Sequence, residues 1–373
     1  MAWGVSMQIE IERASLLPAL IVVSGVVDRR QTLPILGNLL VDCVDGKVTL
    51  SATDLELQVV TTFEALKADD GRVTVPARKV VDICRALPEG VRVELNVTGE
   101  RATLVAGRSR FVLSTMPAED FPTLTEDFEG TSFKVEQAVL RRLLDKASIS
   151  MAVQDVRYYL NGVLLCVEGD RLLAVATDGH RLSKIEGATV QDFEGDPRQV
   201  IIPAKCVVEL KRLLEPTGRD VSVRCSDRTL TAALNGTELT TKLVDGRYPE
   251  FERVIPRDLS RRALIDRSAL LGALHRTAIL SNEKFKGVRM TFSEGMLRLE
   301  SENPDREAAE EELEIDYSGD DVTVGFNVGY VLDVLGAVDA DRIEVAFTGP
   351  KGSAIWKGED REDETFVVMP MQL

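Results

Sequence analysis

The sequence predicts an α+β protein built from three similar domains, each with two helices and antiparallel sheets. A glycine leads into a strand hairpin at Gly37, Gly162 and Gly287, which are spaced 125 residues apart. In each case an Asp-Gly or Glu-Gly turn separates the two strands, a signal typical of an antiparallel hairpin. Three repeats of about 125 residues account for nearly all of the 373 residues.

Helices are predicted twice in each repeat because apolar residues recur at helical spacing. One helix of each repeat follows a proline or an asparagine, residues that favour a helix start. The matching segments are Val75–Leu87, Ile202–Leu214 and Phe326–Val338 for this helix, and Ala14–Val26, Ala138–Ser150 and Ser268–Leu280 for the other.

Alternating apolar and polar residues predict further strands after the second helix of a repeat. In the first two repeats they cover residues 92–98, 102–105, 110–115, 221–225, 229–234 and 238–244. Proline and acidic residues mark linkers at 117–130 and 248–261. The expected domains therefore span residues 1–125, 132–252 and 260–373.

The composition excludes several classes of protein. Hydrophobic residues make up 44% and charged residues 28%, which is enough apolar material for packed cores and excludes a disordered chain. No stretch approaches the roughly 20 apolar residues of a membrane span, and no secretory signal opens the chain. We therefore expect a cytoplasmic protein. The five cysteines form no C-x-x-C pair, so they predict buried small side chains and not a zinc or redox site.

Charge is separated between element types. The net charge is −16, yet the helical segments together carry about +8 and the rest of the chain about −24, when the segments are counted as residues 13–30, 77–87, 136–150, 204–214, 267–280 and 327–338. Such helices could simply have solvated faces, because lysine and arginine are good helix formers. Glutamate forms helices equally well but is scarce on them. If the helices share one surface, that surface would attract a polyanion through its phosphates, without selecting a base sequence.

Eight stretches in the same order resemble the bacterial sliding clamp family, the beta subunit of the replicative DNA polymerase III. The resemblance covers essentially the whole chain. The stretches are Thr32–Leu40, Val75–Lys79, Gln154–Gly162, Ala176–Leu182, Lys242–Pro249, Ile279–Phe285, Gly325–Val328 and Met369–Leu373.

This resemblance implies the DNA clamp fold, in which two copies form a head-to-tail homodimeric ring with helices inside and sheets outside. It implies a DNA-binding processivity factor of DNA replication and repair with no catalysis, no cofactor and no metal. The ring would encircle double-stranded DNA without sequence preference and tether the alpha subunit of the replicative polymerase. Further expected partners are the clamp loader, repair polymerases, mismatch repair proteins and ligase.

The resemblance also implies site residues. DNA contacts carry over onto Arg30, Arg78, Gln154, Tyr158 and Tyr159. Arginines suit phosphates, and the tyrosines could stack on a base or lie against the backbone. By pattern alone, the tyrosine pair would simply lead into a strand.

A cleft for partner peptides is implied between the second and third domains, where an apolar pocket with polar edges would accept leucine or phenylalanine anchors. We name the residues of this set the cleft residues: Leu160, Thr177, Gly179, His180, Arg181, Leu182, Pro249, Arg253, Val254, Asn327, Tyr330, Ser353, Met369, Pro370 and Met371. By pattern alone, the terminal methionine run is an ordinary last strand. Gln372 and Lys351 depart from the residues common in the family.

The implied dimer interface pairs a basic strand edge with an acidic run. One protomer would contribute Lys79, Arg108, Arg110, Phe111 and Leu113, and its partner Ile279, Leu280, Glu307, Glu310 and Glu311. Taken alone, the acidic run from Glu307 to Glu314 could be a solvated helix or loop.

Two other classes of function stay open at this point. A peptide-binding scaffold that never encircles DNA would explain the cleft residues but not the basic helices. A hydrolase would need a catalytic constellation, but His180 and His275 are the only histidines and no nucleophile-elbow or phosphate-loop motif is present. The Thr177-Asp178-Gly179-His180 sequence looks more like a turn at a strand end, because Thr53-Asp54 recurs in the first repeat without a histidine.

Overall fold

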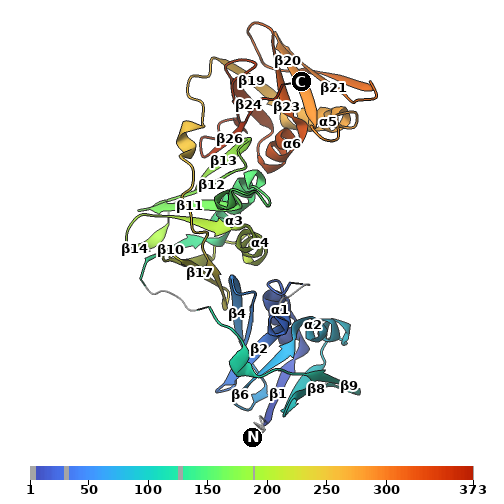
Figure 1. The fold of residues 1–373 in the computed structure, drawn as a ribbon, viewed down its shortest axis with the longest axis vertical. Helices are drawn as coiled ribbons and strands as arrows, with labels where there is room; N and C mark the ends of the chain where they lie inside the picture. Colours follow the sequence, from blue (N-terminus) through green and yellow to red (C-terminus); the bar gives the residue numbers. More distant parts are fainter. Residues whose placement is uncertain (1–5, 29–32, 125–128, 188–189, 373) are drawn as a thin grey trace. The chain divides into compact units, whose positions relative to one another are not determined.

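The structure is a computed structural model that describes residues 6–28, 33–124, 129–187 and 190–372. Its chain forms two compact units (Figure 1). The first comprises residues 1–138, 191–196 and 208–243, and the second comprises residues 139–190, 197–207 and 244–373. Of the predicted site residues, Arg30 lies outside the described residues.

The element order repeats three times, which confirms the predicted α+β fold class with three similar domains. The first repeat contains β1 (Ser6–Glu12), α1 (Arg13–Ser24), the 3₁₀ turn η1 (Pro34–Gly37), β2 (Asn38–Val44), β3 (Lys47–Thr53), β4 (Leu57–Glu64), β5 (Lys67–Ala68), β6 (Gly71–Pro76), α2 (Ala77–Ala86), β7 (Arg92–Thr98), β8 (Arg101–Ala106), β9 (Ser109–Ser114) and η2 (Ala118–Asp120).

The second repeat contains β10 (Thr131–Glu136), α3 (Gln137–Ala147), η3 (Ser148–Ser150), η4 (Tyr158–Leu160), β11 (Gly162–Glu168), β12 (Arg171–Thr177), β13 (Arg181–Gly187), β14 (Gln191–Glu194), β15 (Arg198–Pro203), α4 (Ala204–Leu213), β16 (Asp220–Cys225), β17 (Thr229–Leu234), β18 (Thr237–Lys242) and η5 (Phe251–Arg253). The third contains β19 (Arg261–Asp266), α5 (Arg267–Ala278), β20 (Gly287–Ser293), β21 (Met296–Glu302), β22 (Ala308–Glu314), β23 (Val322–Asn327), α6 (Val328–Ala337), β24 (Arg342–Phe347), β25 (Ala354–Gly358) and β26 (Glu364–Val368).

Among the described residues all strand pairs are antiparallel, and two of the four sheets cross repeat boundaries. A nine-stranded sheet has the order β14-β10-β16-β17-β18-β4-β3-β2-β6, and β18 of the second repeat pairs there with β4 of the first. An eight-stranded sheet has the order β15-β11-β12-β13-β26-β25-β24-β19, and β13 pairs there with β26 of the third repeat. The strands of the second repeat are thus divided between these two sheets.

The two remaining sheets end in strands of opposite charge. Strand β9 is the last of the five-stranded sheet β5-β1-β7-β8-β9, and β22 is the first of the four-stranded sheet β22-β21-β20-β23. The acidic run from Glu307 to Glu314 is therefore mostly an edge strand, and the alternative of a helix or loop is wrong. An edge strand presents unpaired backbone groups that can bind a further strand.

Helix ends are capped by long side chains from distant elements. Arg13, at the start of α1, donates from Nε to the Cys84 carbonyl oxygen of α2 over 2.8 Å. Arg267, at the start of α5, donates from Nη1 to the Leu335 carbonyl oxygen of α6 over 2.9 Å. Cations are favourable at a helix C-terminus, where carbonyl groups lack helical partners. These contacts hold the two helices of one repeat together; α1 and α2 lie side by side (Figure 1).

The predicted helices agree with the structure except at their ends. The segment 138–150 is an α-helix to Ala147 and a 3₁₀ turn over Ser148–Ser150. Helix α2 buries Ala77, Val80, Val81 and Cys84, the spacing that predicted it. Among the described residues, none of the helices is long and apolar enough to cross a membrane.

Candidate functional site

A tightly bonded turn joins β12 to β13 and contains four of the cleft residues. The Thr177 hydroxyl donates to the Arg181 carbonyl oxygen over 2.6 Å, and the Gly179 N–H donates back to that hydroxyl. The Asp178 carboxylate accepts from the backbone N–H groups of His180 and Arg181. Gly179 has a φ of +90°, a conformation that favours glycine. The TDGH sequence is thus a strand-end turn, as its pattern indicates.

The C-terminal segment lies against this turn. Val368 of β26 pairs with Arg181 of β13, and the Met369 N–H donates to the His180 carbonyl oxygen over 3.0 Å. The Met371 N–H donates to the Gly325 carbonyl oxygen at the end of β23. The Val-Val-Met-Pro-Met run thus ends the last strand, β26, with its valines, and its methionines follow that strand with bonds to both the second and the third repeat.

A buried apolar cluster includes two of the cleft residues, Leu160 and Leu182. Leu160, Leu182 and Val367 are at most 2% exposed and pack with Tyr248, while Phe251 and Ile255 lie against the same cluster. The Tyr248 hydroxyl accepts the Thr177 N–H over 3.0 Å, and burial raises the pKa of this phenol well above its usual range. The segment with Pro249, Arg253 and Val254 is thereby held beside the 177–181 turn.

Charged groups surround Tyr330. The Arg181 guanidinium lies 4.3 Å from the centre of the Tyr330 ring and forms ion pairs with Asp178 and with Asp333 of α6. Partial burial raises the pKa of the Tyr330 hydroxyl. Asn327 caps α6, because its side-chain oxygen accepts the Gly329 N–H over 2.9 Å. The Arg181 side chain is therefore held in place between the Tyr330 ring and the two carboxylates, before any ligand binds.

The predicted DNA-contact residues of the second repeat lie on one loop. Gln154 has a left-handed φ of +54°, and Tyr158 and Tyr159 belong to the short turn η4. Tyr158 is 57% exposed, whereas Tyr159 packs against the buried apolar cluster that includes Leu160. The two rings meet edge to face with centroids 5.8 Å apart. Tyr158 is thus exposed to a ligand. The pair precedes β11, which begins at Gly162, and Tyr159 packs inward, as the pattern alone predicts.

Several helix cations are engaged within the protein. Arg142 pairs with Asp363, Lys146 with Glu364, and Arg276 with Glu311. Arg212 of α4 donates to the Val22 carbonyl oxygen at the end of α1 over 2.6 Å. Arg78, in contrast, is exposed in the first turn of α2. The net helix charge seen in the sequence thus overstates the number of cations available to a ligand.

The predicted interface residues divide into exposed and engaged groups. Ile279 is 77% exposed, and Arg108 and Arg110 are exposed at β9. Leu113 points inward and is only 7% exposed. Both oxygens of Glu311 accept hydrogen bonds from Arg276, which lowers the pKa of this carboxyl.

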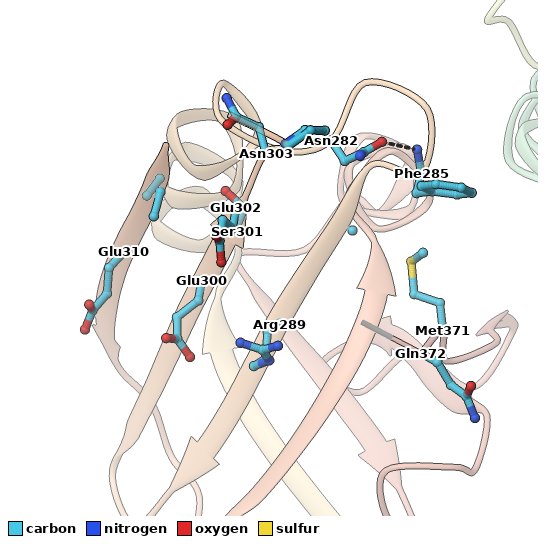
Figure 2. Close-up of a pocket in the computed structure, with 14 residues that line it drawn as sticks. Asn282, Phe285, Arg289, Glu300, Ser301, Glu302, Asn303, Glu310, Met371 and Gln372 are labelled. Carbon is cyan, nitrogen blue, oxygen red and sulfur yellow. Dashed lines mark hydrogen bonds between the residues drawn. The ribbon is translucent and has the colours of Figure 1, made fainter. Parts of the chain in front are cut away.

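A cavity of about 570 Å³ lies over the strands next to the acidic edge (Figure 2). Arg289, Glu300 and Glu310 are cross-strand neighbours on β20, β21 and β22. The carboxylates of Glu300 and Glu310 lie side by side in Figure 2. Phe285 and Met371 also line the cavity, so it adjoins the terminal segment.

The remaining sequence predictions concern cysteines and metals. All five cysteines are free, and burial raises the thiol pKa of Cys84 to about 11 and of Cys166 to about 12. Within the described ranges, no three or more histidine, cysteine or acidic side chains gather as a metal site would require.

Pattern reasoning missed Arg157, Asp178, Tyr248 and Asp333, which hold the cleft residues without belonging to that set. For Arg157, Asp178 and Tyr248, the one available signal in the sequence is their position inside the stretches that resemble the family. Asp333 carried no such signal, because its partner lies 152 residues away.

Comparisons with known proteins identify the relatives of this chain. Family models of the DNA polymerase III beta subunit match residues 7–125 (N-terminal domain), 134–250 (central domain) and 252–372 (C-terminal domain). The beta sliding clamp of Pseudomonas aeruginosa is 44% identical over 98% of this chain and 100% of its own length. That of Escherichia coli K12 is 43% identical over the same shares. The crystal structure of the DNA polymerase III subunit beta from P. aeruginosa has a TM-score of 0.95 at 43% identity, covering 98% of this chain and 100% of that chain.

Proposed function

The chain belongs to the DNA polymerase III beta subunit family, the beta sliding clamps, and we propose that it forms a head-to-tail homodimeric ring around duplex DNA. Sliding clamps are non-catalytic processivity subunits, so the task requires binding and topology, not turnover. The similarity over the whole length of the relatives carries this proposal.

Edge-strand charge supports the dimer. In our proposal, β9 of one protomer adds to β22 of its partner, so that the exposed Arg108 and Arg110 meet the acidic strand that contains Glu310. Exposed Ile279 would lose its contact with water there, together with Phe111. Opposite charges set the register, whereas the apolar contacts contribute most of the binding free energy. The partner's β9 would also cover an otherwise open edge.

We further propose that Arg30, Arg78, Gln154, Tyr158 and Tyr159 contact the encircled DNA. Exposed Arg78 would approach phosphates, and exposed Tyr158 would lie against the sugar-phosphate backbone or a base. A few contacts suffice, since a closed ring is retained by topology. Several helix cations already form ion pairs within the protein, so fewer of them would hold the DNA phosphates. Weak phosphate contacts suit a protein that must slide.

The cleft residues would bind short peptides of several partners in turn: the polymerase alpha subunit, the clamp loader, repair polymerases, mismatch repair proteins and ligase. The apolar cluster of Leu160, Leu182 and Val367 suits leucine or phenylalanine anchors. Met369 and Met371 are partly exposed and flexible in shape, which favours recognition of different anchors. We place this activity in the cytoplasm and assign one clamp domain each to residues 1–125, 132–252 and 260–373.

Topological retention tests the ring. The protein is loaded by an active bacterial clamp loader with ATP onto a nicked circle and onto the same DNA cut once, at salt that suppresses phosphate contacts. We expect retention on the circle and loss from the linear DNA. Equal loss from both would overturn the ring and favour the peptide scaffold.

The dimer interface is tested with Ile279→Asp, which places a charge in the proposed apolar contact. We expect sedimentation to give a monomer that no longer stays on the nicked circle. Val44→Asp is the matched control, since Val44 is an exposed aliphatic residue of β2 outside the proposed interface. A dimeric Ile279→Asp variant would place the interface elsewhere.

A further inference from the structure

Arg157 connects the loop that carries the two tyrosines with the turn that carries four cleft residues. Its Nη2 donates to the Asp178 carbonyl oxygen over 3.0 Å and also to Asp155 Oδ2 over 2.8 Å. Its Nε donates to Asp155 Oδ1 over 3.0 Å. The guanidinium is thus held by a bidentate carboxylate on its own loop and reaches the 177–181 turn with the second N–H of Nη2.

The glycine at position 179 makes this contact possible. A Cβ atom there would lie 2.9 Å from Nη1 and 3.1 Å from Nη2 of Arg157. Gly179 also has a φ of +90°, which side-chain-bearing residues rarely adopt. The Asp178–Gly179 peptide is therefore shaped to receive the guanidinium, and the bond in turn fixes the orientation of that peptide.

The loop itself is closed by its own hydrogen bonds. The Asp155 N–H donates to the Asn161 side-chain oxygen, and Asn161 Nδ2 donates back to the Asp155 carbonyl oxygen. The Ala152 N–H donates to the Leu160 carbonyl oxygen. Tyr158 and Tyr159 follow Arg157 directly. A ligand on the tyrosines would accordingly restrict the residual motion of Arg157 too.

We propose that Arg157 is a positioning residue that couples the DNA-contact loop to the peptide cleft, so that duplex DNA on the tyrosines strengthens peptide binding. This inference rests on the proposed function of both sites. The first ligand loses binding free energy because it restricts the motion of the loop and the turn that Arg157 joins. The second ligand then binds an element that is already restricted, so it binds more tightly. Linkage requires the same factor in the opposite direction.

The test compares peptide affinity with and without DNA. A fluorescent synthetic decapeptide with adjacent leucine and phenylalanine side chains is titrated into the dimer alone and into the dimer loaded on a nicked circle. We expect about fivefold tighter peptide binding on DNA, at the lower end of typical coupling. Arg157→Lys keeps the charge but lacks the planar fork, and we expect it to reduce the factor to about one.

Two further variants separate position from charge. Asp155→Asn leaves Arg157 charged but removes its bidentate anchor, so it should also reduce the coupling. Arg171→Ala removes a highly exposed arginine of the same unit, at the opposite end of β12 from the 177–181 turn, and should retain the full factor. In the free protein, amide exchange at His180 and Arg181 should accelerate in Arg157→Lys, because their turn loses its external bond.

The outcomes are distinguishable. If the unmodified protein binds neither duplex nor peptide, the proposed function fails and the coupling with it. If both ligands bind but their affinities are independent, or if Arg157→Lys retains the fivefold factor and slow exchange, only the role of Arg157 is overturned.

Discussion

The Lys146 ammonium group of α3 lies 2.5 Å from the Glu364 carboxylate of β26, and both side chains are almost completely buried. Glu364 follows Asp363, which pairs with Arg142 of the same helix. Five residues beyond Glu364, the chain reaches Met369, the first of the terminal cleft residues. This ion pair therefore fixes the position of the C-terminal segment from the second repeat.

Replacing Lys146 by methionine should destabilise the protein strongly. The second oxygen of Glu364, Oε1, has no hydrogen-bond partner among the described residues, so the variant would leave a buried carboxylate without compensation. Removal of one partner of a buried pair costs about 3–5 kcal/mol. Urea unfolding would measure this loss.

The double variant Lys146→Met with Glu364→Leu serves as the control for charge burial and should recover most of the stability. Lys47→Met, at an exposed lysine of β3, should change little. A loss below 1 kcal/mol in Lys146→Met would contradict the importance of the pair.

Tyr248→Phe should weaken peptide binding more than its small change in volume implies. The variant removes the acceptor of the Thr177 N–H, and an unsatisfied buried donor costs about 1–3 kcal/mol. We expect lower thermal stability together with weaker peptide affinity by calorimetry. Tyr317→Phe is a matched control, because this tyrosine is also buried but bonds to a carbonyl oxygen far from the cleft residues. Equal peptide affinities in both variants and the unmodified protein would contradict the role of Tyr248.

Gly179→Ala should impair the cleft without preventing folding. A methyl group there would meet the Arg157 guanidinium on backbone that disfavours side chains. Such strain costs of order 1–3 kcal/mol, and we expect at least tenfold weaker peptide binding. At Gly218, a Cβ atom would meet nothing within 4 Å and φ is not positive, so Gly218→Ala is the matched control. Peptide affinity unchanged by Gly179→Ala would show that the turn can relax.

Acid titration should reveal the Arg157 fork. Hydrogen bonds from the Arg157 side chain hold the pKa of Asp155 at about 2, below the ordinary 3.8. Since this pKa is depressed in the folded state, the stabilisation is complete above the ordinary pKa and is lost as the pH falls through about 2. Carbon-detected NMR of the Asp155 carboxyl would measure it, with Arg157→Lys as the comparison. An Asp155 titration midpoint near pH 3.8 in the unmodified protein would contradict the bidentate contact between Arg157 and Asp155.

Local patterns in the sequence predict the repeat, the helices and the strand hairpins. These features follow from local patterns: apolar residues at helical spacing, such as Val80, Val81 and Cys84 of α2, or alternation ending at Gly and Asp turns. Resemblance over eight stretches also identified the family and named the cleft residues. A local pattern repeats reliably because the same short-range forces act in each copy.

Only the tertiary structure decided which charges have partners. Arg13, Arg212 and Arg267 were counted as helix cations, yet each caps a helix 68 to 190 residues away in sequence. Two ion pairs also join residues that are distant in sequence: Arg181 with Asp333, and Lys146 with Glu364. Sequence spacing cannot specify such pairs, because only packing brings the partners together. This packing lies within one repeat for Arg13 and Arg267, and it follows the pairing of β13 with β26 for Asp333 and Glu364.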